Sequence, residues 1–362
     1  MLDETIPYLE RFVAYETTAE KPESIAECLE WVESEFLADT KGLERKSGQV
    51  EGFPYLYLKH SAARLLWLAH IDVVPGRKEL FSLRLSDGRA FGRGVKDMKG
   101  GTLAFFLAYR EACRAGKSPP ANVLVTSDEE IAGSTVETLL KNTIIGGPVA
   151  LTPDNGSKDQ IVVQQKGMIW AQLSARGKGG HGASPWDAEN PNRTLIDALQ
   201  RLHRAFPSGG EDDWRITVEV TRFYGDDERV DSQISRISRC GLDIRFPPDY
   251  TFTDAVNIVK RELPEGCSLD IHRYGAPVKT APDSPTVEAI KRIADDVTSQ
   301  LIPIGREHGT SDGRFLAEYG IPVVIYGPVG GGIHADDEWI SMESLEQHIE
   351  ISRRLLEEIS TS

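Results

Sequence analysis

The chain has 362 residues, which is enough for one large or two ordinary domains with a sizeable core. Its net charge of −15 argues against nucleic acid or an anionic membrane as a partner, because both bind through basic patches. Four widely spaced cysteines without CxxC spacing predict free thiols in a reducing cytosol. The acidic N-terminus lacks a signal-peptide pattern, and no apolar run reaches about 18 residues, which also favours a cytoplasmic protein without a membrane span.

Residues 1–167 alternate between helical and strand-like patterns. Apolar residues recur at helical spacing in four stretches, which are 3–15, 22–37, 102–115 and 133–141. Short apolar runs predict strands at 55–59, 65–69, 123–126 and 149–151. The run at 65–69 has no polar alternation, which is typical of a strand buried on both faces. Alternation of strands and helices predicts an α/β fold with a mostly parallel sheet.

The pattern changes near residue 168 and changes back near residue 277. Between these points, two-faced segments predict strands at 169–175, 214–221, 241–246 and 269–273, with helices at 192–206 and 253–262. The α/β pattern then returns, with helices at 285–300, 313–319 and 342–359 and a strand at 321–326. We therefore predict a discontinuous α/β domain, residues 1–167 and 277–362, with an inserted α+β domain, residues 168–276.

Polar residues follow the strand expected at 65–69. His70 and Asp72 are two positions apart, so in a strand their side chains point the same way. A metal-bound imidazole usually donates its second N–H to a carboxylate, and Asp72 is placed to accept it. A His–Asp pair without a metal is the alternative. Asp97 lies in a glycine-flanked loop, where a carboxylate can bridge two cations, and a simple N-cap is its alternative.

More acidic residues and a second histidine follow the other expected strands. Glu129 and Glu130 follow the strand at 123–126, and on an extended backbone one can bind a metal while the other faces a water molecule. A solvated acidic turn is the alternative. Asp154 and His334 also follow expected strands, and open α/β sheets bind ligands at the carboxyl ends of their strands. Two histidines with several carboxylates suit a pair of divalent cations and metal-assisted hydrolysis.

One further histidine belongs to the expected insert. His181 lies in the glycine-dense segment 177–185. A histidine on such a loop suits a hydrogen-bond donor to a substrate or to an oxyanion, and an ordinary turn histidine is the alternative.

The chain resembles the di-zinc aminoacylase/carboxypeptidase family along almost its whole length. That family includes succinyl-diaminopimelate desuccinylase, acetylornithine deacetylase and bacterial glutamate carboxypeptidase. The resemblance is carried by His-Ile-Asp-Val-Val-Pro at 70–75, Gly-Arg-Gly at 92–94, Asp-Met-Lys-Gly at 97–100 and Ser-Asp-Glu-Glu at 127–130. Segments 309–315 and 188–191 are most similar to the desuccinylase branch. By contrast, Asp154 stands where desuccinylases have a glutamate, and there the chain is more similar to aminoacylases and dipeptidases.

The resemblance implies a site with two zinc ions, for which cobalt or manganese can substitute. Asp97 bridges both ions, and the complete set of implied ligands is His70, Asp97, Glu130, Asp154 and His334. Glu129 is then the general base and acid, and Asp72 orients His70. The peptide bond after Asp97 is expected to be cis.

The same resemblance implies residues that contact the substrate. His181 reaches the active site of a partner subunit and stabilises the tetrahedral oxyanion. Arg245 pairs with a substrate carboxylate, and a solvated strand arginine is the alternative. The remaining expected contacts are Thr310, Ser311 and Gly331. The insert is then a dimerisation or lid domain, which predicts a homodimer.

The expected function is therefore a metal-dependent hydrolase that cleaves the amide bond of an N-acyl amino acid or a short peptide with a free carboxylate. A deacylase similar to the desuccinylases or acetylornithine deacetylases is the first expectation. A dipeptidase or carboxypeptidase that uses the same metals is an alternative, because its amide chemistry is identical. A catalytically dead binding or scaffold dimer is a further alternative, which predicts a damaged set of metal ligands.

Overall fold

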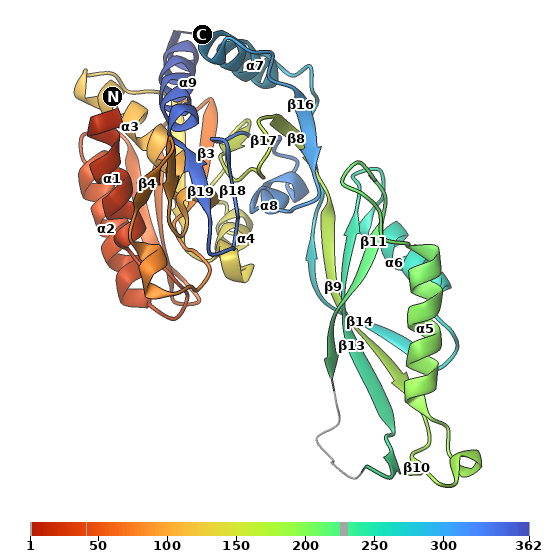
Figure 1. The fold of residues 1–362 in the computed structure, drawn as a ribbon. Coiled ribbons are helices and arrows are strands. Elements are labelled where there is room, and N and C mark those ends of the chain that lie inside the picture. The colour runs from red at the N-terminus through yellow and green to blue at the C-terminus, as the bar shows by residue number, and fades with distance from the viewer. Residues whose placement is uncertain (1, 41, 225–230, 362) are drawn as a thin grey trace. The chain divides into compact units, whose positions relative to one another are not determined.

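The structure is a computed structural model, and it describes residues 2–40, 42–224 and 231–361. Contacts between residues divide the chain into two compact units, whose course is shown in Figure 1. Unit 1 comprises Met1–Gln164 and Val278–Ser362, and unit 2 comprises Gln165–Pro277. The boundaries expected from the sequence, 167/168 and 276/277, fall close to these limits.

The central sheet of unit 1 is mixed, with parallel strands in its middle. In order across the sheet, its strands are β1 (Glu44–Val50), β2 (Phe53–Lys59), β6 (Ala121–Thr126), β3 (Leu65–His70), β7 (Ala150–Thr152), β17 (Val323–Ile325), β8 (Ile161–Gln165) and β15 (Val278–Lys279), and β16 (Ile304–Glu307) pairs with β8. The neighbours β6, β3, β7 and β17 are parallel, whereas β1, β2 and β8 run antiparallel to their partners. The expected α/β fold with a largely parallel sheet is confirmed.

Helices cover both faces of this sheet. The core on one face receives side chains from α1 (Leu2–Ala14), α2 (Pro22–Phe36), α3 (Gly100–Arg114), α7 (Pro285–Thr298) and α9 (Met342–Thr361). A smaller core on the other face receives side chains from α4 (Thr135–Lys141) and α8 (Gly313–Glu318). Leu65, Trp67 and Ala69 of β3 belong to the first core. Leu66 and Leu68 belong to the second, so β3 lacks polar alternation because it is buried on both faces.

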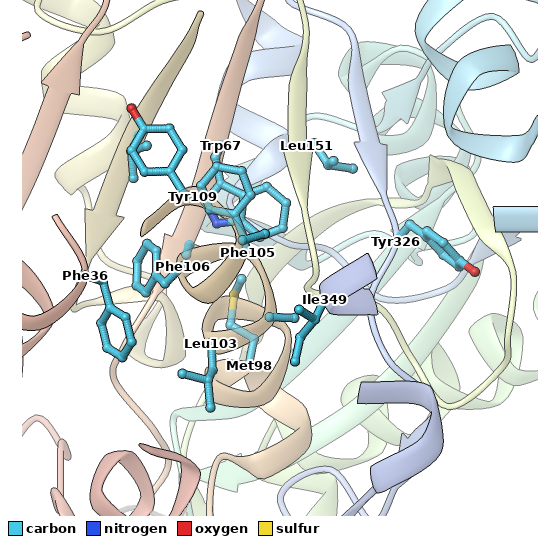
Figure 2. Packing of buried hydrophobic residues seen from close by; sticks show 14 of the residues in the cluster. Phe36, Trp67, Met98, Leu103, Phe105, Phe106, Tyr109, Leu151, Tyr326 and Ile349 are labelled. Atoms are coloured by element: carbon cyan, nitrogen blue, oxygen red, sulfur yellow. The ribbon is translucent and has the colours of Figure 1, made fainter. Parts of the chain in front are cut away.

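Aromatic packing holds α3 against β3. The rings of Trp67 and Phe105 are stacked with their centroids 3.9 Å apart, and Phe105 is stacked on Tyr109 at 5.5 Å. Figure 2 shows these rings and Met98, which belongs to the same core. Burying each such ring contributes about 1.5–3 kcal/mol relative to leaving it exposed. The packing therefore fixes the start of α3, and with it the loop that carries Asp97.

A small antiparallel sheet joins two segments that are far apart in the sequence. Its strands, in order, are β18 (Gly330–Gly331), β19 (Trp339–Ser341), β5 (Arg89–Phe91) and β4 (Arg84–Ser86). Trp339 pairs with Phe91 in its register. The pairing brings the chain just before Asp97 next to the chain just after His334. No pattern in the sequence predicts this sheet.

In the part of unit 2 that the structure describes, a separate antiparallel sheet carries two helices, as expected for the insert. Its strands, in order, are β11 (Thr217–Tyr224), β13 (Ile237–Phe246), β9 (Gly167–Arg176) and β14 (Cys267–Gly275). Alternate residues of β9 and β13 form one core with α5 (Pro191–Ala205) and α6 (Phe252–Arg261). α6 begins at a capping box in which Thr251 and Asp254 each accept a backbone N–H of the other. The short strands β10 (Gly180–His181) and β12 (Gln233–Ile234) form a second pair.

The helices expected from the sequence are present, with ends that shift by a few residues. The strand expected at 321–326 is shorter, and β1, β8, β15 and β16 are not among the expected strands. Four further single turns are η1 (Lys78–Phe81), η2 (Val95–Lys99), η3 (Glu129–Ile131) and η4 (Pro185–Asp187). The four cysteines are free thiols, as expected. Within the described ranges, every helix is too short or too polar to span a membrane.

Candidate active site

Several polar side chains leave one edge of the central sheet. His70 is the last residue of β3, Glu129 and Glu130 follow β6, and Asp154 follows β7. Because β6, β3 and β7 are adjacent and parallel, their carboxyl ends lie together. The order of the strands thus brings polar residues from three separate sequence segments into one cluster.

Asp97 and His334 come from the two segments that the small sheet joins. Gly94 has a φ of +80°, and a Cβ there would lie 2.5 Å from Cγ1 of Val73, so the turn before Asp97 requires glycine. The peptide bond between Asp97 and Met98 is cis, as expected. His334 lies between β18 and β19 with a φ of +64°.

The structure brings all five expected metal ligands together in two groups that share one residue. The groups are His70, Asp97 and Asp154, and Asp97, Glu130 and His334, with the ligand atoms of each group within 4.8 Å of one another. Oδ1 of Asp97 lies 3.2 Å from Nε2 of His70, and Oδ2 lies 3.5 Å from Nε2 of His334. Each oxygen of Asp97 therefore faces a different histidine, which is the arrangement that a bridging ligand needs.

The cluster concentrates buried negative charge. Burial, and next the charge of Asp97, raise the pKa of Asp154 to about 8. Burial also raises the pKa of Glu130, and it raises the pKa of Glu129 well above its usual value. Hydrogen bonds to Asp97 and Glu130 raise the pKa of His334 to about 10. Buried carboxylates this close to one another are stabilised by protons or by a divalent cation, and imidazole with carboxylate is a donor set that zinc accepts, so the residues fit a metal.

Asp72 connects His70 to Glu130. Nδ1 of His70 lies 3.1 Å from the carbonyl oxygen of Asp72 and 3.4 Å from its Oδ1. Oδ2 of Asp72 accepts the backbone N–H of Glu130 at 2.9 Å. These contacts favour the tautomer of His70 with a proton on Nδ1, which leaves Nε2 as the atom that faces Asp97.

Glu129 belongs to neither of the two ligand groups. Its Oε1 lies 3.5 Å from Nη1 of Arg314, whereas Oε2 of Glu130 lies 2.9 Å from Nε2 of His334. The two glutamates diverge, but the expected extended backbone is wrong, because they begin the single turn η3. The N–H of Ala132 donates to the backbone oxygen of Glu129 at 2.7 Å, which closes this turn. Oδ2 of Asp128 accepts the N–H and the hydroxyl of Thr135 at 3.0 and 2.8 Å, which ties the turn to the first residue of α4.

Arg314 is a site residue that the sequence analysis does not single out. It lies at the start of α8 inside segment 309–315, which carries part of the family resemblance. Its neighbour Ser311 is buried, and the hydroxyl of Ser311 accepts the N–H of Gly313 at 3.2 Å. Thr310 is partly buried and Gly331 is buried, both in unit 1. Whether these residues hold a substrate stays a prediction.

His181 and Arg245 belong to unit 2. His181 is exposed, and its Nδ1 accepts the N–H of Ala183 at 3.1 Å. Arg245 lies on β13, where its Nε and Nη2 donate to the two carboxylate oxygens of Asp243 at 2.7 and 2.9 Å. The guanidinium is therefore already held in a fixed orientation by a carboxylate. The contacts of His181 and Arg245 with a substrate stay predictions.

The fold and this cluster together define a metallohydrolase. Imidazole and carboxylate ligands lie at the carboxyl edge of an α/β sheet, with a further, partly buried glutamate that interacts with one of them. The sequence profile of Peptidase family M20/M25/M40 matches residues 66–358, which is more than half of the chain. The chain belongs to this family, and it is a metallohydrolase that acts on C–N bonds.

Individual relatives agree with this assignment. The chain is 30% identical over 313 residues to succinyl-diaminopimelate desuccinylase from Acidiphilium cryptum (strain JF-5), covering 80% of this chain and 81% of that one. Two solved structures share its fold at 19% identity and a TM-score of 0.80. They are aminopeptidase PepT from Bacillus cereus, with 99% of both chains covered, and the M20 family metallo-carboxypeptidase Sso-CP2 from Sulfolobus solfataricus, with 99% of this chain and 100% of that one. The resemblance found in the sequence is confirmed.

Proposed function

We propose that the protein is a di-zinc deacylase that hydrolyses the amide bond of an N-acyl amino acid with a free carboxylate, and that cobalt or manganese can replace zinc. The observation that carries this proposal is the pair of ligand groups that share Asp97, with Glu129 beside them and outside both. The 30% identity to a desuccinylase supports an N-acyl amino acid as the substrate class.

Each residue of the cluster has a role in this proposal. His70, Asp97 and Asp154 hold one metal, and Asp97, Glu130 and His334 hold the other. Bound zinc supplies Lewis acidity and lowers the pKa of water from about 15.7 toward 7. Asp72 keeps His70 in the tautomer that presents Nε2.

Proton transfer falls to Glu129, because its carboxylate interacts electrostatically with Asp154 and His70 without belonging to either ligand group. It takes a proton from the attacking water and later gives this proton to the leaving amine. His181 donates a hydrogen bond to the oxyanion, and Arg245 binds the substrate carboxylate. Thr310, Ser311 and Gly331 hold the remainder of the substrate.

A metallo-exopeptidase is the second candidate function. It uses the same metals and the same general base, and it differs only in the group that lies on the acyl side of the amide bond. The observation that favours it is Asp154, since desuccinylases have a glutamate at this position and dipeptidases resemble this chain there. A catalytically dead scaffold would be expected to have a damaged set of metal ligands. All five ligand residues lie in the two groups, which argues against such a scaffold.

A substrate panel distinguishes these candidates. The zinc-loaded protein is assayed with N-succinyl and N-acetyl amino acids and with dipeptides, and kcat/KM is compared after elemental analysis of the zinc content. We expect two zinc ions per chain and the highest kcat/KM for an N-acyl amino acid. The highest kcat/KM for a dipeptide would support the exopeptidase instead. Two bound metals with no hydrolysis of any compound would contradict both.

The proposal includes a homodimer formed through unit 2. Of the twelve large apolar side chains exposed among the described residues, seven lie in unit 2, which are Trp170, Trp186, Ile196, Val220, Phe223, Tyr224 and Tyr250. Three of these belong to β11, which is an edge strand of its sheet. An exposed apolar edge strand favours pairing with another chain.

Light scattering after gel filtration tests the dimer. The substitution Phe223→Glu on β11 is expected to give monomers. Leu301→Glu in unit 1 is the matched control, because Leu301 is also highly exposed, and it should remain dimeric. A wild-type protein that is monomeric at micromolar concentration would exclude this assembly.

A further inference from the structure

A buried carboxylate outside the two ligand groups organises the backbone around Asp97. Glu338 is 3% exposed, and each of its carboxylate oxygens accepts two hydrogen bonds. Oε2 accepts from the backbone N–H of Gly94 at 2.8 Å and from Nη1 of Arg93 at 3.0 Å. Oε1 accepts from the backbone N–H of Lys96 at 2.9 Å and from that of Asp97 itself at 3.1 Å. One side chain thus accepts three of the backbone N–H groups of the turn that presents the bridging aspartate.

The arginine of this arrangement reaches the segment that carries His334. Arg93 is 3% exposed. Its Nη1 also donates to the carbonyl oxygen of Ala335 at 3.0 Å, and its Nη2 donates to the carbonyl oxygen of His334 at 3.4 Å. Glu338 itself lies four positions after His334, and its backbone oxygen accepts the N–H of Gly92 at 3.2 Å. The pair therefore connects the turn that presents Asp97 to the segment that carries His334, through side-chain and backbone hydrogen bonds.

We propose that Glu338 and Arg93 are positioning residues of the metal site, a pair that we call the Arg93–Glu338 brace. Glu338 sets the orientation of Asp97, and Arg93 sets the position of His334 relative to Asp97. All four donors of Glu338 belong to the chain, so this carboxylate acts through the ligands and is not itself one of them. The inference rests on the proposed metal site. It adds the contacts that keep the segments of Asp97 and His334 close enough to bind the same metal ion.

The substitution Glu338→Gln tests the role of Glu338. It keeps the shape of the side chain but replaces one oxygen by an NH2 group, which faces two N–H donors whichever way the amide is turned. Since Asp97 belongs to both ligand groups, we expect both zinc equivalents to bind about 10–100-fold more weakly. Stepwise zinc affinities are measured by competition with a chromophoric chelator, and the unfolding of the metal-free protein is followed by circular dichroism.

The substitution Arg93→Lys tests the other half of the brace. Lysine keeps the positive charge beside Glu338, but it lacks the planar fork that reaches the carbonyl oxygens of His334 and Ala335. We expect this variant to weaken chiefly the zinc equivalent that His334→Ala abolishes, and to leave the other equivalent close to its wild-type affinity. A residue that only stabilises the fold would weaken both equivalents alike and lower the unfolding temperature of the metal-free protein.

Asp337→Asn is the matched control, because Asp337 is an exposed carboxylate next to Glu338, and it should bind zinc as the wild type does. Wild-type stepwise affinities in Glu338→Gln would overturn the inference. If Glu338→Gln does not fold, the test rests on Arg93→Lys. An equal loss of affinity for both zinc equivalents in that variant, or wild-type affinity for both, would then overturn the inference. A wild-type protein that binds no zinc would overturn the proposed function and this inference together, whereas failure of the variants alone leaves the proposed function intact.

Discussion

Nη1 of Arg314 lies 3.5 Å from Oε1 of Glu129, and Nη2 of the same guanidinium lies 3.2 Å from Oδ1 of Asp312. Arg314 is 2% exposed, so this charge is held between two carboxylates away from bulk water. Burial raises the pKa of Glu129 well above its usual value, and the guanidinium opposes this rise only weakly. Arg314 is therefore placed to hold the carboxylate of the proposed general base in position.

Replacement of Arg314 should lower turnover without removing metal. In Arg314→Met, Glu129 loses its partner, and we expect kcat to fall about 10–100-fold because the base is misplaced, with a smaller change in KM. Arg314→Lys keeps the charge and should lose less. Zinc content and steady-state kinetics are the measurements, with Arg292→Lys on the exposed side of α7 as the control. Wild-type kcat in Arg314→Met would show that Arg314 does not position Glu129.

The substitution Glu129→Gln should retain two zinc ions and lose activity by about 10²–10⁴-fold, the usual contribution of a general acid or base. Glu130→Gln changes a proposed ligand instead, so it should lose metal affinity as well as activity. Elemental analysis beside kinetics separates these outcomes. Near-normal turnover in zinc-loaded Glu129→Gln would remove Glu129 from the mechanism.

The parts of the site that the sequence predicts are those that local patterns encode. β3, β6 and β7 are short runs that sit in the core, so their apolar residues are visible in the sequence, and the polar residues after them fall together once the strands pair in parallel. The five ligand positions follow from this rule and from the family resemblance. The turn at Glu129 does not follow from the sequence, because local backbone hydrogen bonds such as that from Ala132 to Glu129 form it, and an extended-strand pattern does not reveal them.

The parts that the sequence does not predict depend on contacts between remote segments. β5 and β19 are each three residues long and show no periodicity, yet their pairing aligns the segments of Asp97 and His334. In the sequence, nothing distinguishes Glu338 from other acidic residues, and its four hydrogen-bond donors appear only in the structure. Arg314 likewise becomes a partner of Glu129 only when α8 packs near η3.

Zinc binding should release protons at neutral pH. The pKa of Asp154 is raised to about 8 and that of His334 to about 10, so each group holds a proton near neutrality before metal binds. Metal ligands must be deprotonated, and we therefore expect the apparent zinc affinity to rise as pH increases from about 6 to about 8. Calorimetry in buffers with different ionisation enthalpies measures the released protons. Binding with no proton release would contradict the ligand assignment of both residues.

Loss of the Asp154 carboxylate should stabilise the metal-free protein. Folding raises the pKa of this group from 3.8 to about 8, so the fold favours its protonated form and loses stability as pH rises through that interval. Asp154→Asn removes this penalty, and each kcal/mol regained corresponds to about 2–4 °C in melting temperature. We expect the chelator-treated variant to melt above wild type at pH near 8, to match it at pH near 4, and to bind less zinc. A lower melting temperature at pH near 8 would show that the carboxylate is stabilised in some other way.

The substitution His181→Ala separates catalysis from metal binding in unit 2. His181 is exposed on β10, so its loss should leave the core of unit 2 intact. As an oxyanion donor it should contribute about 10²–10³-fold to kcat while zinc content stays unchanged. His203→Ala, an exposed histidine on α5, is the control and should leave kcat unchanged. A parallel loss of zinc in His181→Ala would instead make His181 a metal ligand, whereas unchanged kcat would leave it an ordinary turn residue.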